Sequence, residues 1–183
     1  RTVVTRLQNP PTLDLELKHF EPIGTFPLPE YESQQIAFPP FLEVIEYLER
    51  NRFGEVILST PGPMGLVGLL AARFLRLRTA AIYHTDFPQY VRQLTGDLNL
   101  ESMTWQYMQW FYNQADVIFA PSEYYRRYLI ENGFDPAKLH VLPRGVHLDQ
   151  FNTEKRRPDF FQRFGLGGAP KFVYVGRVSR EKN

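Results

Sequence analysis

The sequence predicts an α/β fold, with a parallel sheet that carries helices on both faces. Two observations lead to this prediction. Short apolar runs of strand length alternate with segments of helical period along most of the chain. Several of these runs also end directly in polar residues, as strands do in open α/β sheets, where ligands collect beyond the carboxyl ends.

The first forty residues are predicted to be extended. Residues 2–5 and 13–20 are expected to form strands, and residues 21–40 contain five prolines, which favour an extended segment or a loop over a helix. A helix is predicted next, over 41–52, because Phe41, Val44 and Leu48 recur at helical spacing with charged residues opposite them.

The middle of the chain is predicted to hold two strands and two long helices. A strand over 55–60 is followed by a turn at 61–65, where Pro63 suits the first turn of a helix that runs to about residue 77. The strand over 79–85 contains the apolar residues 80–83, and Pro88 should prevent further pairing. The longest helical pattern covers residues 98–115.

The last part of the chain is predicted to start with a strand over 116–122. Ser122 is expected to cap a helix over 123–132 that Gly133 ends. A strand over 139–143, a short helix over 158–164 and a final strand over 171–175 follow. Because the glycine-rich segment 165–170 reads as a linker, the predicted domains are residues 1–164 and 171–183.

Composition excludes several classes of protein. Twenty-one basic and 20 acidic residues among 183 leave no overall field to attract nucleic acid, so no nucleic-acid partner is expected. There is no cysteine, and thus neither a disulfide framework nor a thiolate metal site. The longest apolar run, residues 64–72, is too short to cross a bilayer. The chain begins without methionine and ends just after a strand-like run, which suggests a piece of a longer protein.

The helix predicted over 98–115 is unusually aromatic. Leu100, Met103 and Tyr107 recur on one face, and Trp105 and Met108 lie on an adjacent face. A helix buried on two sides is the expected explanation. Peripheral contact with a membrane interface is the alternative.

Polar residues follow four predicted strands, and in a parallel sheet all four exits share one edge. They include Thr60 and Gly62, then His84, Thr85 and Asp86, then Ser122, and then Arg144. This convergence favours a ligand cleft, in which an imidazole, hydroxyls and a carboxylate could contact a substrate. The alternative is a set of strand exits whose polar groups only cap the following segments.

A second candidate site follows the last predicted strand. Gly176 allows close passage of the chain past a ligand, and Arg177 and Lys182 could together bind a diphosphate. No Walker A or G-x-G-x-x-G pattern is present. A solvated charged loop is the alternative interpretation.

Five segments in order carry a resemblance to a known family: TPGPMG (60–65), YHTDFPQYV (83–91), ADVIFAPSEYYRRYL (115–129), LPRGVHLDQF (142–151) and YVGRVSREKN (174–183). Together they resemble the group 1 (family 4) retaining glycosyltransferases of the two-domain GT-B fold. The resemblance implies a truncated half of that architecture, Rossmann-like, followed by the start of the nucleotide-sugar domain. It covers the chain from about residue 55 to its end.

The resemblance implies transfer of a sugar from a nucleotide-sugar, such as a UDP- or GDP-hexose, to a sugar or lipid acceptor. Retention of anomeric configuration, no metal or other cofactor, and a cytoplasmic location are implied with it. His84 would meet the donor sugar as the catalytic residue. The other roles implied are donor binding by Arg144, Gly176, Arg177 and Lys182, and lining of the acceptor-side cleft by Thr60, Gly62, Thr85, Asp86 and Ser122.

The sequence departs from the family pattern in two ways, and both limit the activity expected of this chain alone. The family's glycine-rich loop after its first strand is not seen, and its E-x7-E motif would lie beyond Asn183. The fragment itself is therefore expected to be inactive. Two alternatives stay open: a nucleotide-sugar epimerase of similar architecture, and a non-catalytic module that binds a sugar or nucleotide.

Overall fold

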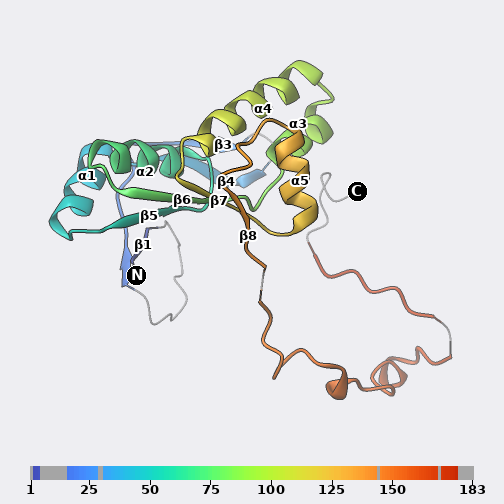
Figure 1. The fold of residues 1–183 in the computed structure, drawn as a ribbon. Helices are drawn as coiled ribbons and strands as arrows, with labels where there is room; N and C mark the ends of the chain where they lie inside the picture. The colour runs from blue at the N-terminus through green and yellow to red at the C-terminus, as the bar shows by residue number, and fades with distance from the viewer. Residues whose placement is uncertain (1, 5–15, 29–30, 144, 169, 177–183) are drawn as a thin grey trace.

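A four-stranded parallel sheet forms the centre of the structure (Figure 1). The computed structural model describes residues 2–4, 16–28, 31–143, 145–168 and 170–176. The sheet contains β5 (Glu55–Leu58), β6 (Arg78–Ile82), β7 (Val117–Ala120) and β8 (Leu139–Val141), paired in that order. The α/β class and a parallel sheet flanked by helices are therefore confirmed, although the described helices that connect its strands share one face rather than both.

Four helices connect the strands of this sheet. α2 (Pro63–Phe74) joins β5 to β6, α3 (Phe87–Thr95) and α4 (Leu98–Asn113) join β6 to β7, and α5 (Glu123–Glu131) joins β7 to β8. Each crossover moves one strand further in the same direction, and right-handed crossovers then place their helices on the same face. The core agrees, because Leu69, Phe111 and Leu129 from three of these helices share one buried cluster with the sheet.

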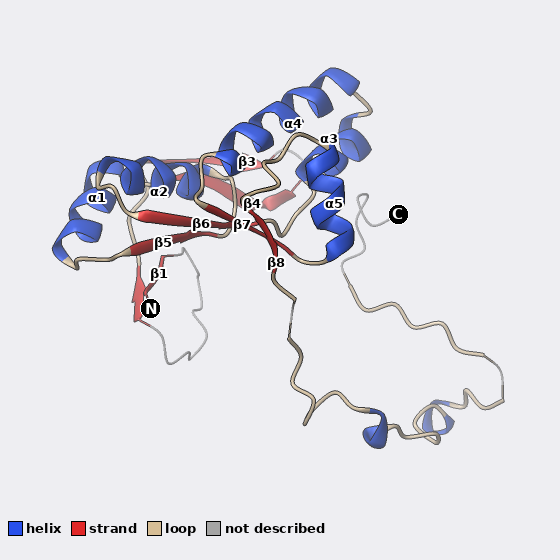
Figure 2. Ribbon diagram, viewed as in Figure 1, coloured by secondary structure: helices blue, strands red, loops and turns tan. Residues whose placement is uncertain are grey.

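A second, smaller cluster lies beside this core. α1 (Phe41–Arg50) precedes β5 and packs on α2, burying Val44 against Ala71. Phe20 completes the cluster, with its ring edge-on to Tyr47 at 5.7 Å between centroids. In Figure 2, α1 and α2 lie together on one side of β5 and β6. The helix predicted over 41–52 is confirmed, ending two residues early.

The N-terminal residues form two small sheets outside the central one. β1 (Thr2–Val4) pairs in parallel with β2 (Glu16–Lys18). β3 (Gly24–Leu28) and β4 (Tyr31–Phe38) form an antiparallel hairpin, with a register shift between Pro27 and Leu28. Such an irregularity is expected at a proline, which cannot donate to a ladder. The extended conformation predicted for residues 21–40 is thus confirmed in a more regular form.

Three predictions about single elements need correction. α3 was not expected: Pro88 lies in its first turn, where a missing N–H costs nothing, and so starts a helix as well as ending a strand. Residues 171–175, predicted as a strand, form no ladder with the residues that the structure describes, and Phe172 is 99% exposed. The helix predicted over 158–164 is reduced to a 3₁₀ turn at Gln162–Phe164, after a similar turn at Thr153–Lys155.

The aromatic helix is buried on one side, not two. In α4 the side chains of Met108, Phe111 and Tyr112 are buried, whereas Met103 and Trp110 are exposed. None of the described helices is long and apolar enough to span a membrane. The domain boundary at 165–170 stays a prediction. Beyond Gly145 the described chain leaves the sheet as an extended segment and then turns back (Figure 1).

Candidate functional site

The carboxyl ends of β5 to β8 lie along one edge of the sheet. The register pairs Leu58 with Ala81, Ile82 with Phe119 and Ala120 with Val141, so each strand ends within a residue or two of its neighbour. The predicted site residues Thr60, His84 and Ser122 follow these ends and therefore share the edge. This shared edge is what the structure shows; the convergence of these side chains on a ligand and their roles in chemistry stay predictions.

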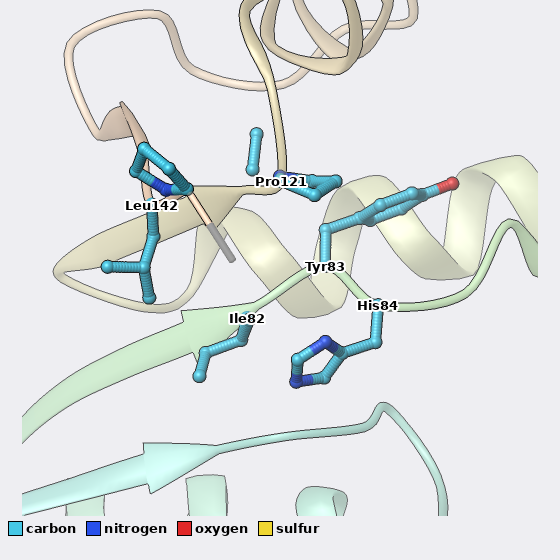
Figure 3. A pocket seen from close by; sticks show the side chains of 7 residues that line it. Ile82, Tyr83, His84, Pro121 and Leu142 are labelled. Carbon is cyan, nitrogen blue, oxygen red and sulfur yellow. The ribbon is translucent and has the colours of Figure 1, made fainter. Parts of the chain in front are cut away.

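A cavity of about 150 Å³ opens at this edge, beyond β6, β7 and β8. It is lined by Ile82, Tyr83, His84, Ala120, Pro121, Leu142 and Pro143. Figure 3 shows Leu142 and Pro121 near its upper side, Ile82 and His84 below, and the Tyr83 ring directed away from the imidazole. The volume is below the roughly 300 Å³ at which small-molecule pockets begin. The cavity can therefore hold only part of a substrate.

Two hydrogen bonds fix the backbone that carries His84. The Tyr83 N–H donates to the Phe119 carbonyl oxygen at 2.9 Å, which extends the β6–β7 pairing by one residue. The Tyr112 hydroxyl donates to the Ile82 carbonyl oxygen at 3.3 Å. Tyr83 is 1% exposed, with ring centroids of Tyr112 and Phe134 at 5.5 and 6.1 Å. His84 is the next residue. Because adjacent side chains of an extended backbone point to opposite sides, the burial of Tyr83 leaves the His84 imidazole exposed at the cavity.

Asp86 is engaged with the protein rather than with the cavity. Its carboxylate caps α3, accepting from the Gln89 N–H at 3.4 Å. Burial and the adjacent Asp86 carboxylate together raise the pKa of Tyr128 to about 12, and they raise the pKa of Tyr83 as well. The Tyr83 hydroxyl makes no hydrogen bond of standard geometry among the described residues. At neutral pH both hydroxyls therefore keep their protons, because burial and the negative charge of Asp86 disfavour their ionisation.

The exit of β5 is held closely by α2 and α4. Gly62 precedes Pro63 at the start of α2, and the Tyr107 hydroxyl donates to the Pro61 carbonyl oxygen at 2.5 Å. A Cβ atom on Gly65 would overlap the Thr60 carbonyl oxygen. Only glycine therefore fits where the helix crosses this exit. Thr60 itself is exposed on the rim, outside the cavity lining.

Of the other predicted site residues, three are described by the structure and three are not. Ser122 caps α5 as predicted, its Oγ accepting from the Tyr125 N–H at 3.3 Å, and Thr85 is half-buried between His84 and the α3 cap. Gly176 lies in the extended C-terminal segment and does not line the cavity. Arg144, Arg177 and Lys182 lie outside the described residues.

Sequence reasoning missed the apolar part of the lining. Pro121, Leu142 and Pro143 directly follow β7 and β8 and line the cavity. They were not predicted as site residues, because only polar residues at the strand ends were considered. The usable signal was their position, since the first residues after parallel strands line the edge whatever their polarity. Among the described residues no three His, Asp or Glu side chains gather as metal ligands would.

Comparison with known proteins decides the family. The profile of Glycosyltransferase Family 4 matches residues 2–150, most of the chain. The chain belongs to glycosyltransferase family 4. The predicted resemblance to group 1 glycosyltransferases is thereby confirmed.

Individual relatives of this family 4 chain are distant. It is 30% identical over 128 residues to a GDP-mannose-dependent alpha-mannosyltransferase of Mycobacterium tuberculosis, covering 70% of this chain and 33% of that protein. It is 25% identical over 183 residues to an alpha-monoglucosyldiacylglycerol synthase of Streptococcus pneumoniae, covering 94% of this chain and 41% of the relative. The chain thus spans about a third to two fifths of these curated relatives.

A comparison of folds adds little. A putative UDP-N-acetylglucosamine 2-epimerase of Listeria monocytogenes aligns with a TM-score of 0.39 at 11% identity, over 69% of this chain and 30% of that one. A likeness at this level does not favour the epimerase alternative.

Proposed function

We propose that this family 4 chain is the acceptor-side part of a glycosyltransferase that moves a sugar from a nucleotide-sugar to an acceptor, with retention of anomeric configuration. The observation that supports it most is the position of His84. Its imidazole lines a cavity at the carboxyl edge of the parallel sheet, the edge where ligands bind in open α/β folds. The small cavity suits one side of a cleft, to which a second domain contributes the rest.

The proposed chemistry follows from where charge develops. The bond from the anomeric carbon to the diphosphate oxygen breaks, the acceptor oxygen bonds to the same face of that carbon, and the acceptor hydroxyl passes its proton to the departing diphosphate oxygen. Negative charge then grows on the departing diphosphate, and Arg177 and Lys182 are proposed to stabilise it. His84 is proposed to donate to a hydroxyl of the donor sugar.

The proposed donor is a GDP- or UDP-hexose. Relatives are named as GDP-mannose-dependent mannosyltransferases and as a synthase of a glucosyl lipid, which leaves sugar and lipid acceptors both within the proposal. A cytoplasmic location is proposed with it, since nucleotide-sugars are supplied there.

Two sets of variants test the assignment in the intact enzyme. His84→Ala should reduce turnover by about a hundredfold or more with little change in donor affinity, since it removes a contact to the reacting sugar. Arg177→Ala and Lys182→Ala should each weaken nucleotide-sugar binding by about 1–3 kcal/mol in calorimetry. Full activity of His84→Ala, or unchanged donor affinity in both cation variants, would refute the assignment.

Independence from metal is a separate part of the proposal. If the two cations neutralise the diphosphate, activity should be unchanged after treatment with EDTA and should not rise when Mg²⁺ or Mn²⁺ is restored. Loss of activity on chelation, with recovery on adding either ion, would overturn this part and leave the sugar-transfer assignment in place.

A further inference from the structure

The helix α4 contacts the ends of two neighbouring strands of the sheet. Its Tyr107 hydroxyl donates to the Pro61 carbonyl oxygen at 2.5 Å, in the exit of β5. Its Tyr112 hydroxyl donates at 3.3 Å to the carbonyl oxygen of Ile82, the last residue of β6. Both carbonyl groups lie beyond the last residue pair of the β5–β6 ladder. α4 therefore joins the two strands at the point where the candidate site begins.

The Tyr112 contact is made to the peptide group that enters Tyr83, the residue before His84. The carbonyl oxygen of this peptide, which belongs to Ile82, accepts from Tyr112, and its N–H donates to the Phe119 carbonyl oxygen at 2.9 Å. Tyr112 is 1% exposed, and burial raises the pKa of its hydroxyl, so the hydroxyl keeps its proton and stays a donor. Because the peptide group is held at both its polar atoms, the direction of the backbone that carries the imidazole is fixed.

The Tyr107 contact is made on the acceptor-side rim. Pro61 lies between Thr60 and Gly62, the two residues of the β5 exit that are proposed to line that side. The Tyr107 ring lies 6.2 Å from the ring of Phe111, measured between centroids, and Phe111 is fully buried. Burial also raises the pKa of the Tyr107 hydroxyl, which therefore stays a donor to the rim at neutral pH.

α4 is also held to the fold independently of these two hydroxyls. The Gln109 side-chain amide donates to the Asn132 carbonyl oxygen at 2.6 Å, and the Asn113 amide donates to the Gly133 carbonyl oxygen at 3.1 Å. These bonds tie α4 to the end of α5. Since an α-helix rises about 1.5 Å per residue, the two tyrosines are separated by about 7.5 Å along a rigid axis. The helix thus sets the separation of the two backbone points that they bond.

We propose that Tyr107 and Tyr112 are positioning residues, which hold the acceptor-side rim and His84 at the separation that sugar transfer needs. The inference rests on the proposed function, in which His84 contacts the donor sugar and the β5 exit lines the acceptor side. Neither tyrosine touches a substrate, and each acts through the carbonyl group that it bonds. A displacement of reacting groups by about 1 Å can cost about a hundredfold in rate. The loss of either hydroxyl should therefore affect catalysis more than stability.

Kinetics of the intact enzyme with single hydroxyls removed test the proposal. Tyr112→Phe should lower kcat about tenfold or more, while donor affinity in calorimetry stays within about twofold, since the proposed diphosphate contacts are unchanged. Tyr107→Phe should instead raise KM for the acceptor about threefold or more. Tyr125→Phe is the matched control and should change neither constant. The Tyr125 ring also contacts Tyr83, at 6.1 Å between centroids, but its hydroxyl bonds neither exit within the described part of the chain.

Two further measurements separate positioning from a general loss of stability. Leu129→Ala removes a fully buried side chain of α5 and should lower the urea midpoint more than Tyr112→Phe does, yet keep kcat at a temperature where both variants are folded. The Tyr83 amide should exchange about threefold faster or more in Tyr112→Phe than in wild type or Tyr125→Phe. This exchange measurement needs no substrate.

Other outcomes overturn the proposal. A kcat of Tyr112→Phe equal to that of wild type, or losses of kcat that follow the urea midpoints of Tyr112→Phe and Leu129→Ala, would leave Tyr112 with a structural role only. An equal loss in Tyr125→Phe would assign the effect to the aromatic cluster as a whole. If Tyr112→Phe does not fold, Tyr107→Phe decides, and an unchanged acceptor KM in that variant refutes the proposal. A folded wild type that transfers no sugar would instead refute the proposed function, so the two failures are distinguishable.

Discussion

Gly65 sets the position of the β5 exit at the level of single atoms. Its missing side chain lets α2 cross the backbone of Thr60, where a Cβ would lie 2.9 Å from the carbonyl carbon and overlap the oxygen. We expect Gly65→Ala to lower the free energy of unfolding by about 3 kcal/mol, because helix or exit must shift. Urea unfolding measures this cost. In the control Gly62→Ala the new Cβ meets only Thr60 Oγ1, at 3.7 Å, and should cost less than about 1 kcal/mol; equal costs would refute the steric reason.

Hydrogen bonds between Asp116 and Thr79 join the amino-terminal ends of β6 and β7, at the edge of the sheet opposite the cavity. One Asp116 carboxylate oxygen accepts from the Thr79 N–H at 2.8 Å and from its hydroxyl at 3.0 Å. The backbone hydrogen bond is the main cause that lowers the pKa of Asp116 below its ordinary value of 3.8. A lowered folded-state pKa means that this stabilisation is full above the ordinary value and disappears as pH falls through the lowered one.

The pH dependence of unfolding tests these hydrogen bonds. Between neutral pH and pH values below the ordinary pKa of Asp116, wild type should lose more stability than Asp116→Asn, which cannot titrate there. Thr79→Val should cost about 1–3 kcal/mol at neutral pH, since Thr79 is 4% exposed and its hydroxyl bonds a charged group. Identical pH profiles for wild type and Asp116→Asn would contradict the assignment.

At the scale of elements, the α3–α4 hairpin depends on its turn. Gly96 ends α3 with a φ of +68°, in the left-handed region, and Asp97 then caps α4. The Asp97 carboxylate accepts from the N–H groups of Asn99 and Leu100 at 2.7 and 3.3 Å. Asp97→Ala should cost about 1 kcal/mol and speed amide exchange in the first turn of α4, whereas Asp97→Asn should retain most of the cap. Equal effects of both variants would show that the side-chain oxygen is not the cap.

Elements defined by local signals were predictable, and elements defined by partners were less so. Ser122 and Gly133 bound α5 as the sequence indicated, because capping needs only neighbouring residues. α3 was missed although Asp86, Pro88 and Gly96 are its local signals, since Pro88 was interpreted only as the end of a strand. Residues 171–175 have the composition of a strand, but a strand exists only beside another strand, and no ladder partner is described for them.

In the candidate site, too, features set by the strand order were predictable, and features set by contacts between distant residues were not. The shared edge of Thr60, His84 and Ser122 was predictable because parallel strands must end on one edge. The commitment of Asp86 to the α3 cap and to the tyrosines was not, since it depends on Tyr83 and Tyr128 meeting it from elements over forty residues apart. The sequence offered a carboxylate beside an imidazole, and only packing decides which of them faces the cavity.

At the scale of the whole molecule, the described helices that connect the strands pack on one face of the central sheet, and the second face is exposed at β5. Leu58 is 3% exposed under α2, while its neighbour Ile57 is 53% exposed on the other face of β5. Because adjacent side chains of a strand point to opposite faces of the sheet, these two exposed fractions describe the burial of the two faces at β5. In the 183-residue chain, Leu58→Ala should cost about 2–4 kcal/mol by leaving a cavity, whereas Ile57→Ala should cost well under about 1 kcal/mol. The urea midpoints of the two variants provide the comparison. A cost for Ile57→Ala that equals the cost for Leu58→Ala would mean that the second face is covered in solution, because a side chain half in water cannot lose as much on truncation as a buried one.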